Sequence, residues 1–329
     1  MNNKLVGFGE LLLRLDPPGH LRLAQADQFQ AKFTGGEANT LVAAKRFGVS
    51  ECIMVSRVPQ HELGTACVDF LKQHGLSTES IVRGGDRLGI LFVETGASLR
   101  PSRVIYDRTN TAFQDSDPQE YGWNTLLKDA SIVHITGTAP ALGAKVNQAL
   151  NDCFAAAKQN NCLVSFDCSY RSALWNIEDA SRAYRQIAKE ADILFASPED
   201  AELFFGFTDT DPDQRIQRLL NDYGLRSIAW TQRQEISAST NRLSGVLWGE
   251  NEKHSSQDYE FEIIDRIGSG DAFAAGILAS FLQEKPLEHA IEFATAAAVL
   301  KHTVVGDFCL VSASEVEELL AGKSLRIRR

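Results

Sequence analysis

Short apolar runs alternate with longer amphipathic segments along the first two thirds of the chain. The apolar runs are four to six residues long, which is typical of strands buried on both faces of a parallel sheet. The amphipathic segments repeat apolar positions every three or four residues, as one face of a helix does. We predict strands at 5–9, 52–56, 131–136, 163–167, 193–196 and 227–231, and helices at 39–47, 62–74, 143–158, 178–190 and 213–223. This alternation predicts an α/β fold with a doubly wound, mainly parallel sheet flanked by helices.

Two stretches interrupt the alternation. Residues 11–34 contain the turn former Pro17-Pro18-Gly19 among mixed polar and apolar positions, and residues 87–115 contain a hairpin pattern with strands at 88–95 and 104–106. We expect these two stretches to pair as a small β-sheet lid. Because the sequence contains neither a repeat nor a low-complexity linker, the lid is expected to project from a single domain over residues 1–329.

Composition and charge exclude several classes of protein. With 44% hydrophobic and 23% charged residues, the chain is neither disordered nor fibrous. The 33 basic and 43 acidic side chains give a net charge of −10, which does not suit a nucleic-acid surface. The basic run at 326–329 is interpreted as a solvated tail. The longest apolar run, 272–282, spans about 16 Å as a helix, roughly half of a bilayer core, so no membrane segment is expected.

The cysteines and the N-terminus indicate a cytoplasmic protein. None of the six cysteines has Cys-x-x-Cys spacing, so reduced thiols are expected rather than a zinc or redox site. The apolar stretch after Lys4 is interrupted by Glu10, and no signal peptide is expected.

The strongest chemical signal is the segment 265–276, Asp-Arg-Ile-Gly-Ser-Gly-Asp-Ala-Phe-Ala-Ala-Gly. It follows a predicted strand at 261–264 and opens the first of two predicted helices, 271–283 and 287–302. Gly268 and Gly270 allow backbone conformations in which successive N–H groups converge on one anion at a helix N-terminus. The third glycine is too far away for a dinucleotide fingerprint, and no Walker A loop occurs in the chain.

Asp271 is the informative residue of this segment. A carboxylate repels phosphate, so a site that only held phosphate would not have one there. A kinase needs a carboxylate, because the attacking hydroxyl must pass its proton to an acceptor in line with the phosphoryl group. The alternative is a first-turn acid that is merely favoured by the helix dipole. No serine-hydrolase elbow occurs, and the seven histidines lack metal-ligand spacing.

Two further groups of residues have the character of a ligand site. Gly35 and Gly36 allow a polyol to approach the backbone, and Asn39 offers both a donor and an acceptor, although it is also a plausible helix cap. Arg108 and Arg171 each follow a predicted strand and present a planar fork suited to a carboxylate or phosphate. For either arginine alone, a surface ion pair is the simpler interpretation.

Together these segments resemble the PfkB (ribokinase-like) family of carbohydrate kinases. Residues 265–276 resemble its C-terminal signature, Asp-x-x-Gly-Ala/Ser-Gly-Asp-x-Phe-x-x-Gly, and residues 35–48 resemble its N-terminal signature. The segments 9–19, 103–108, 166–171 and 301–308 are most similar to the branch of the family that phosphorylates 2-keto-3-deoxygluconate.

The resemblance implies a role for each matching residue. Asp271 would be the base that deprotonates the terminal hydroxyl of the sugar, with Gly268, Ser269 and Gly270 forming the anion hole for the γ-phosphate. The sugar acid would contact Gly35, Gly36, Asn39, Tyr106, Arg108 and Arg171. ATP would contact Ser169, Arg171, Thr231, Arg233, Gly268, Gly270 and Gly306. Asp200 or Glu199, in the place of the family's Asn-x-x-Glu motif, would hold Mg²⁺ directly or through water, and a requirement for a monovalent cation stays open.

The expected activity is ATP-dependent phosphorylation of the 6-hydroxyl of a sugar acid, 2-keto-3-deoxygluconate foremost, in a homo-oligomer built through the lid. Two alternatives stay open at this point. One is a neutral-sugar kinase of the same family, similar to a fructokinase. The other is a non-catalytic sugar-binding protein on the same scaffold, which would have no need of a base at Asp271.

Overall fold

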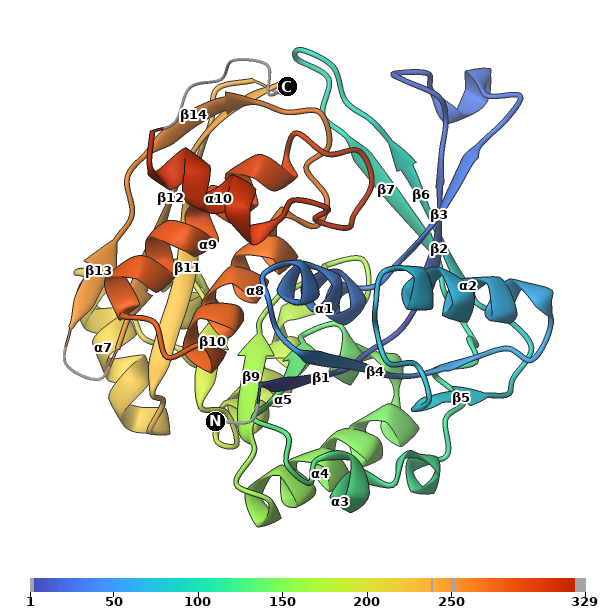
Figure 1. The fold of residues 1–329 in the computed structure, drawn as a ribbon, viewed down its shortest axis with the longest axis horizontal. Coiled ribbons are helices and arrows are strands. Elements are labelled where there is room, and N and C mark those ends of the chain that lie inside the picture. The colour runs from blue at the N-terminus through green and yellow to red at the C-terminus, as the bar shows by residue number, and fades with distance from the viewer. Residues whose placement is uncertain (1–2, 238, 250–251, 323–329) are drawn as a thin grey trace.

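A large mixed sheet forms the centre of the computed structural model, which describes residues 3–237, 239–249 and 252–322 (Figure 1). Within these residues the sheet has ten strands, in the order β13-β12-β11-β10-β9-β8-β1-β4-β5, with β14 paired to β12. The strands are β1 (Lys4–Phe8), β4 (Glu51–Val58), β5 (Ile81–Arg83), β8 (Ile132–Thr136), β9 (Leu163–Asp167), β10 (Ile193–Phe195), β11 (Ser227–Glu235), β12 (Thr240–Trp248), β13 (Lys253–Ser255) and β14 (Tyr259–Glu262).

The part of the sheet from β5 to β11 is parallel throughout, and β12 to β14 extend it antiparallel. The parallel strands β1, β4, β8, β9, β10 and β11 coincide with the predicted ones to within a few residues, whereas the short edge strand β5 was not predicted. The antiparallel extension departs from the prediction, since only a strand near β14 was expected there. The basic run at 326–329 lies outside the described residues.

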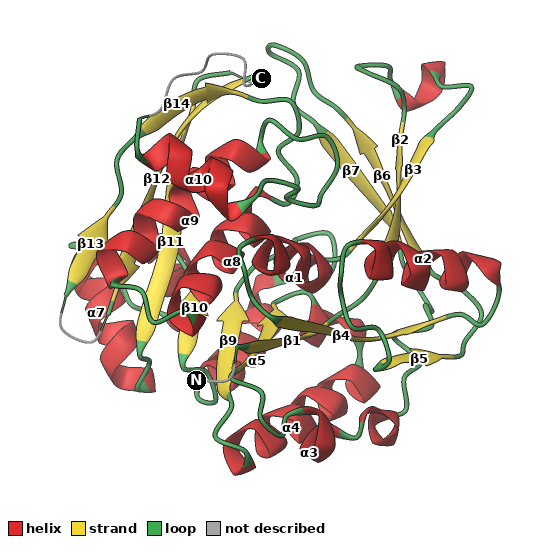
Figure 2. Cartoon of the chain, viewed as in Figure 1, coloured by secondary structure: helices red, strands yellow, loops and turns green. Residues whose placement is uncertain are grey.

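Alternate residues of each central strand point into two separate apolar layers. In β1, Leu5 joins one layer while Val6 and Phe8 join the other, and all three are fully buried. Helices cover both faces, as Figure 2 shows. The first layer contains α1 (Gly36–Arg46), α2 (Glu62–Gln73), α8 (Ser269–Leu282), α9 (Leu287–Lys301) and α10 (Ala313–Leu320). The second contains α3 (Trp123–Leu126), α4 (Ala144–Gln159), α5 (Ile177–Ala188) and α7 (Pro212–Tyr223). The predicted fold class is confirmed.

A second, four-stranded sheet projects from the body of the molecule (Figure 1). Its order is β3-β2-β6-β7, with strands β2 (Leu12–Asp16), β3 (Gln30–Thr34), β6 (Gly89–Glu94) and β7 (Arg103–Asp107). We call it sheet B. Its inner face packs Leu12, Leu91 and Val93 against Ile267, which precedes the glycine-rich turn. The expected lid segment 87–115 runs past this sheet, because Phe113 is buried in the second layer of the main body.

Two further features of the described chain are the lengths of its helices and the state of its cysteines. No helix in the described ranges is long and apolar enough to cross a membrane. All six cysteines are free and buried.

Candidate active site

A cavity of about 500 Å³ lies where the parallel strands end and sheet B begins. Parallel strands direct their carboxyl ends to one edge, so the segments after β1, β8, β9 and β10 meet there with the C-terminal half of β11, as in other open α/β sheets. Fourteen predicted site residues line the cavity: Gly35, Gly36, Asn39, Tyr106, Arg108, Ser169, Arg171, Asp200, Thr231, Arg233, Gly268, Ser269, Gly270 and Asp271. Glu199 and Gly306 are not among the lining residues.

The glycine-rich turn at the start of α8 forms one wall. Gly268 has φ +84°, and a Cβ there would lie 1.9 Å from the carbonyl oxygen of Asp307, so only glycine fits. A Cβ on Gly270 would meet no protein atom within 4 Å, so packing does not explain that glycine. Within the described chain, the N–H groups of Gly268, Ser269 and Gly270 have no hydrogen-bond acceptor. These donors suit an anion that enters the cavity.

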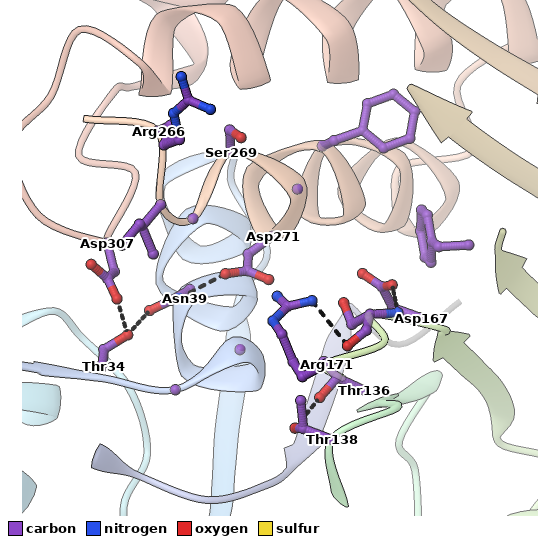
Figure 3. A pocket seen from close by; sticks show the side chains of 18 of the residues that line it. Thr34, Asn39, Thr136, Thr138, Asp167, Arg171, Arg266, Ser269, Asp271 and Asp307 are labelled. Carbon is purple, nitrogen blue, oxygen red and sulfur yellow. Dashed lines mark hydrogen bonds between the residues drawn. The ribbon is translucent and has the colours of Figure 1, made fainter. Parts of the chain in front are cut away.

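Asp271 lies in the first turn of α8, beside these N–H groups. Its Oδ2 accepts a hydrogen bond from Asn39 Nδ2 at 2.7 Å, and Figure 3 shows Arg171 reaching toward it from the opposite side of the cavity. Burial raises the pKa of the Asp271 carboxyl from 3.8 to about 7, although the Asn39 hydrogen bond and Arg171 oppose the shift. A carboxylate with a pKa near 7 suits general-base work at neutral pH.

Arg171 projects into the cavity from the turn after β9. Its Nη1 donates to the carbonyl oxygens of Ser169 and Tyr170, and no described carboxylate pairs with it within 4 Å. Ser169 adopts φ +29°, a conformation rare for a residue with a side chain, and its N–H donates to Asp167. The turn therefore presents, next to Asp271, a guanidinium that forms no ion pair within 4 Å with the described carboxylates but interacts electrostatically with Asp271 and Asp167.

Arg108 is buried, unlike the surface arginine that the simpler interpretation of the sequence suggested. It is 7% exposed, and its Nε lies 2.8 Å from Oε2 of Glu10, to which Nη2 also donates. Its guanidinium lies 5.6 Å from the ring centre of Tyr106, and both side chains line the cavity. Arg108 therefore reaches the cavity as half of a buried ion pair, and much of its charge is compensated.

The C-terminal half of β11 forms a further wall of the cavity, which Trp230, Thr231 and Arg233 line. Burial lowers the pKa of Arg233, and the nearby guanidinium of Arg266 lowers it further. The Gly306 N–H is occupied elsewhere, because it donates to Asp265 Oδ2 at 3.0 Å. A nucleotide contact by Gly306 would therefore require that hydrogen bond to break.

The two candidate metal ligands differ in position. Asp200 lines the cavity but accepts a hydrogen bond from the Ser197 N–H at 2.8 Å, whereas Glu199 is exposed. The described residues contain no group of three His, Cys, Asp or Glu side chains that could enclose a metal ion. With so few carboxylates at this point, the cavity fits a magnesium ion that is held mainly by phosphate and water oxygens, with Asp200 or Asp167 as an outer partner.

Several lining residues escaped the sequence analysis. Glu10 and Asp167 each stand at the end of a strand, and an acidic residue at that position was a usable signal. Thr34, Thr136, Thr138 and Asp307 also line the cavity. Asp307 carried no comparable signal, because only the folded chain brings its loop against Thr34.

A buried carboxylate of raised pKa, a turn of backbone N–H groups and an arginine outside any described ion pair share one cavity at the carboxyl edge of an α/β sheet. This fold and site define a phosphotransferase that acts on a hydroxyl group. The pfkB family of carbohydrate kinases matches residues 2–308, and the chain belongs to this family of sugar kinases.

Three similar proteins are named as kinases of 2-dehydro-3-deoxy sugar acids. A 2-dehydro-3-deoxygalactonokinase of Haloferax volcanii is 31% identical over 100% of both chains. A 2-dehydro-3-deoxygluconokinase of Thermoproteus tenax is 30% identical, covering 96% of this chain and 94% of the relative. The crystal structure of 2-dehydro-3-deoxygluconokinase from Thermotoga maritima superposes with a TM-score of 0.94 at 35% identity, covering 97% of this chain and 98% of that one.

Proposed function

We propose that this kinase transfers the γ-phosphoryl group of ATP to the terminal hydroxyl of a 2-keto-3-deoxy sugar acid, with 2-keto-3-deoxygluconate yielding its 6-phosphate. The observation that carries the proposal is the placement of Asp271 and Arg171 on opposite sides of one cavity, beside free N–H groups. The named relatives support the choice of a sugar acid over a neutral sugar.

The residues divide the chemistry among them. Asp271 takes the proton from the terminal hydroxyl as that oxygen attacks phosphorus. The N–H groups of Gly268, Ser269 and Gly270 face the transferring phosphoryl group and stabilise its charge. Magnesium supplies charge neutralisation at the ATP phosphates when bound, and Asp200 or Asp167 would orient its water ligands.

A carboxylate on the substrate would require a cation in the cavity. Arg171 forms no ion pair within 4 Å among the described residues, although it interacts electrostatically with Asp271 and Asp167, so it is available to attract the carboxylate of a sugar acid. Arg108 offers the cavity a guanidinium already fixed by Glu10, which suits an oriented hydrogen bond better than charge compensation. Sheet B would close over the bound substrate, which excludes water and limits ATP hydrolysis.

The outer face of sheet B supports an assembly of two or more copies. Leu15, Phe92 and Ile105 lie side by side on it, because Phe92 is in register with both other residues. Phe29 packs on Phe92 with ring centres 5.9 Å apart, and Ile105 is 51% exposed. An exposed apolar patch of this kind is typical of an interface.

A direct test measures ADP formation with a panel of acceptors: 2-keto-3-deoxygluconate, 2-keto-3-deoxygalactonate, gluconate and fructose. The proposal expects turnover with at least one keto-deoxy acid to exceed that with fructose by at least tenfold in kcat/KM. The two epimers are both included because the relatives are named for different ones. Equal or better turnover of fructose would favour a neutral-sugar kinase, and no acceptor-dependent ADP with any of them would favour a binding protein.

A further inference from the structure

A continuous chain of polar contacts joins sheet B to the candidate base. The Thr34 hydroxyl, at the end of β3, lies 3.2 Å from Oδ1 of Asn39 and within hydrogen-bond distance of Oδ2 of Asp307, and its one hydrogen goes to one of these two acceptors. Nδ2 of Asn39 then donates to Oδ2 of Asp271 at 2.7 Å. Figure 3 shows the four side chains as one line that ends in the cavity. Two segments distant in sequence, 34–39 and the loop with Asp307, therefore contribute to the setting of one carboxylate.

The Asn39 amide can face Asp271 in only one orientation. A carboxylate accepts hydrogen bonds, so Nδ2 must point to Asp271 and Oδ1 must point to the Thr34 hydroxyl. This arrangement uses Oδ2 of Asp271 and leaves Oδ1. A Cβ placed on Gly36 would lie 3.8 Å from that Oδ1, so the free oxygen faces the glycine and the space above it. The free oxygen is thus directed to the cavity wall where an acceptor hydroxyl could approach.

The other end of the chain is anchored by a buried cation. Arg14, on β2, donates through Nη1 to Asp307 Oδ1 and through Nη2 to Asp265 Oδ2 at 2.9 Å. Arg14, Thr34, Asn39 and Asp307 are all buried. A buried polar network whose members are satisfied is rigid, because breaking any link leaves an unpaired group. The network therefore fixes Asn39 rather than merely touching it.

We propose that Asn39 and Thr34 are positioning residues for Asp271, with Asn39 orienting the carboxylate and Thr34 orienting Asn39. The inference rests on the proposed role of Asp271 as the base. It assigns Asn39 a different task from the sugar contact implied by the family resemblance, since the amide nitrogen is already engaged with Asp271. It also assigns a role to Thr34. Because Thr34 belongs to β3, the orientation of Asp271 depends on the position of sheet B.

The pH profile separates a positioning role from a structural one. The charged groups that face Asp271 are Asp167 at the end of β9, Arg171 after it and Asp307 after α9, and of these only Asp307 contacts Thr34. The Asn39 hydrogen bond favours the ionised form of Asp271. Its loss should raise the pKa of Asp271 and move the acidic limb of the kcat profile to higher pH.

The test compares Thr34→Val with Thr34→Ser, because the first removes the hydroxyl at nearly constant volume and the second retains it. We expect Thr34→Val to lower kcat about 10-fold or more, with the KM of the sugar acid changed less than about twofold and the acidic limb moved upward. Thr34→Ser should stay within about twofold of wild type. Asn39→Ala should produce a larger loss of the same kind.

Two outcomes would overturn the inference. One is a Thr34→Val enzyme with unchanged kcat and an unchanged acidic limb. The other is an Asn39→Ala enzyme whose sugar KM rises while kcat and the limb stay in place, which would make Asn39 a substrate contact. Asn39→Ala removes a buried hydrogen-bond partner and can unfold the protein. The comparison of Thr34→Val with Thr34→Ser is therefore sufficient as a test without it.

A second readout works without any substrate. In protein labelled with ¹³C at aspartate carboxyls, the resonance missing from Asp271→Asn identifies Asp271, and its titration gives the pKa directly. We expect a higher pKa in Thr34→Val and Asn39→Ala than in wild type, and an identical pKa would contradict the relay. If wild type failed to phosphorylate a sugar acid, the proposed function would fail while this titration still decided the relay.

Discussion

Arg108 and Glu10 form a buried ion pair, with Nε of Arg108 2.8 Å from Oε2 of Glu10, at the wall of the cavity. Arg108→Ala should therefore do two things at once. It should weaken sugar-acid binding, and it should destabilise the fold by about 3–5 kcal/mol, because Glu10 would be left charged and unpaired. Urea denaturation and the KM of the sugar acid measure the two effects.

The double variant Glu10→Gln/Arg108→Met separates these effects, because it removes the stranded charge. It should recover most of the stability lost in Arg108→Ala while the KM for the sugar acid stays high. Fructose kinetics serve as a comparison, since a neutral hexose has no carboxylate to lose a partner. Equal losses for both acceptors would count against a carboxylate contact by Arg108.

The rate should depend on pH through Asp271. Its pKa of about 7 means that the base is protonated in acid, so kcat should fall about tenfold per pH unit below pH 6. Asp271→Asn should lower kcat by about 10²–10⁴ and remove this limb. Direct ADP quantification avoids the pH dependence of coupling enzymes, and a wild-type profile that is flat from pH 5 to pH 8 would contradict the assignment.

The same carboxyl should make the native state less stable at high pH. Its pKa is higher folded than unfolded, so its contribution to stability is fully present below about pH 4 and is lost as pH rises through about 7. Asp271→Asn should therefore stabilise the protein at pH 8, by up to about 4 kcal/mol, and the gain should vanish near pH 4. Thermal unfolding at the two pH values measures the difference, and a gain that is equal at both would contradict it.

The two glycines of the turn should respond differently to alanine. Gly268→Ala places a Cβ against the Asp307 carbonyl at positive φ, and should cost stability as well as turnover. Gly270→Ala meets no protein atom, so it should fold like wild type and lose turnover only if phosphate approaches that backbone. Chemical denaturation and kcat together distinguish the cases, and a Gly270→Ala enzyme of full activity would place the phosphate elsewhere.

An assembly through sheet B should dissociate when its outer face is charged. Ile105→Glu should lower the mass observed by sedimentation velocity, whereas Ile177→Glu, at a comparably exposed isoleucine on α5, should leave it unchanged. A wild-type protein that sediments as a monomer would contradict the proposed assembly outright.

Much of the fold could be predicted from the sequence because buried parallel strands are continuous apolar runs. The strand expected at 163–167 is β9 itself, and its final Asp167 marks the cavity edge. β12 was missed, because Thr240–Trp248 mixes polar and apolar residues at the antiparallel end of the sheet. The helix Ala313–Leu320 was also missed, although Ser312 and Glu315 form a capping box that signals its start.

The site was predictable where chemistry depends on local sequence and not where it depends on tertiary pairing. Gly268, Gly270 and Asp271 lie close together in sequence, so a single segment indicates both the glycine-rich turn and the candidate base. The partners that define Arg108 and Asn39 lie far from them in sequence, at Glu10 and Asp271 respectively. No spacing rule connects such residues, so the sequence predicted their contacts with a substrate but not their contacts with Glu10 and Asp271.

The cavity lies between two sheets, and each of them contributes residues to its walls. Tyr106 and the strands that carry Leu12 and Leu91 belong to sheet B, while the glycine-rich turn and Asp271 belong to a helix packed on the main sheet. Substitutions at Tyr106, on the edge strand farthest from Thr34, can change which acceptor is admitted, whereas substitutions at Thr34 also reach Asp271 through Asn39. One scaffold can thereby accept different sugars while it retains the residues that handle the phosphoryl group.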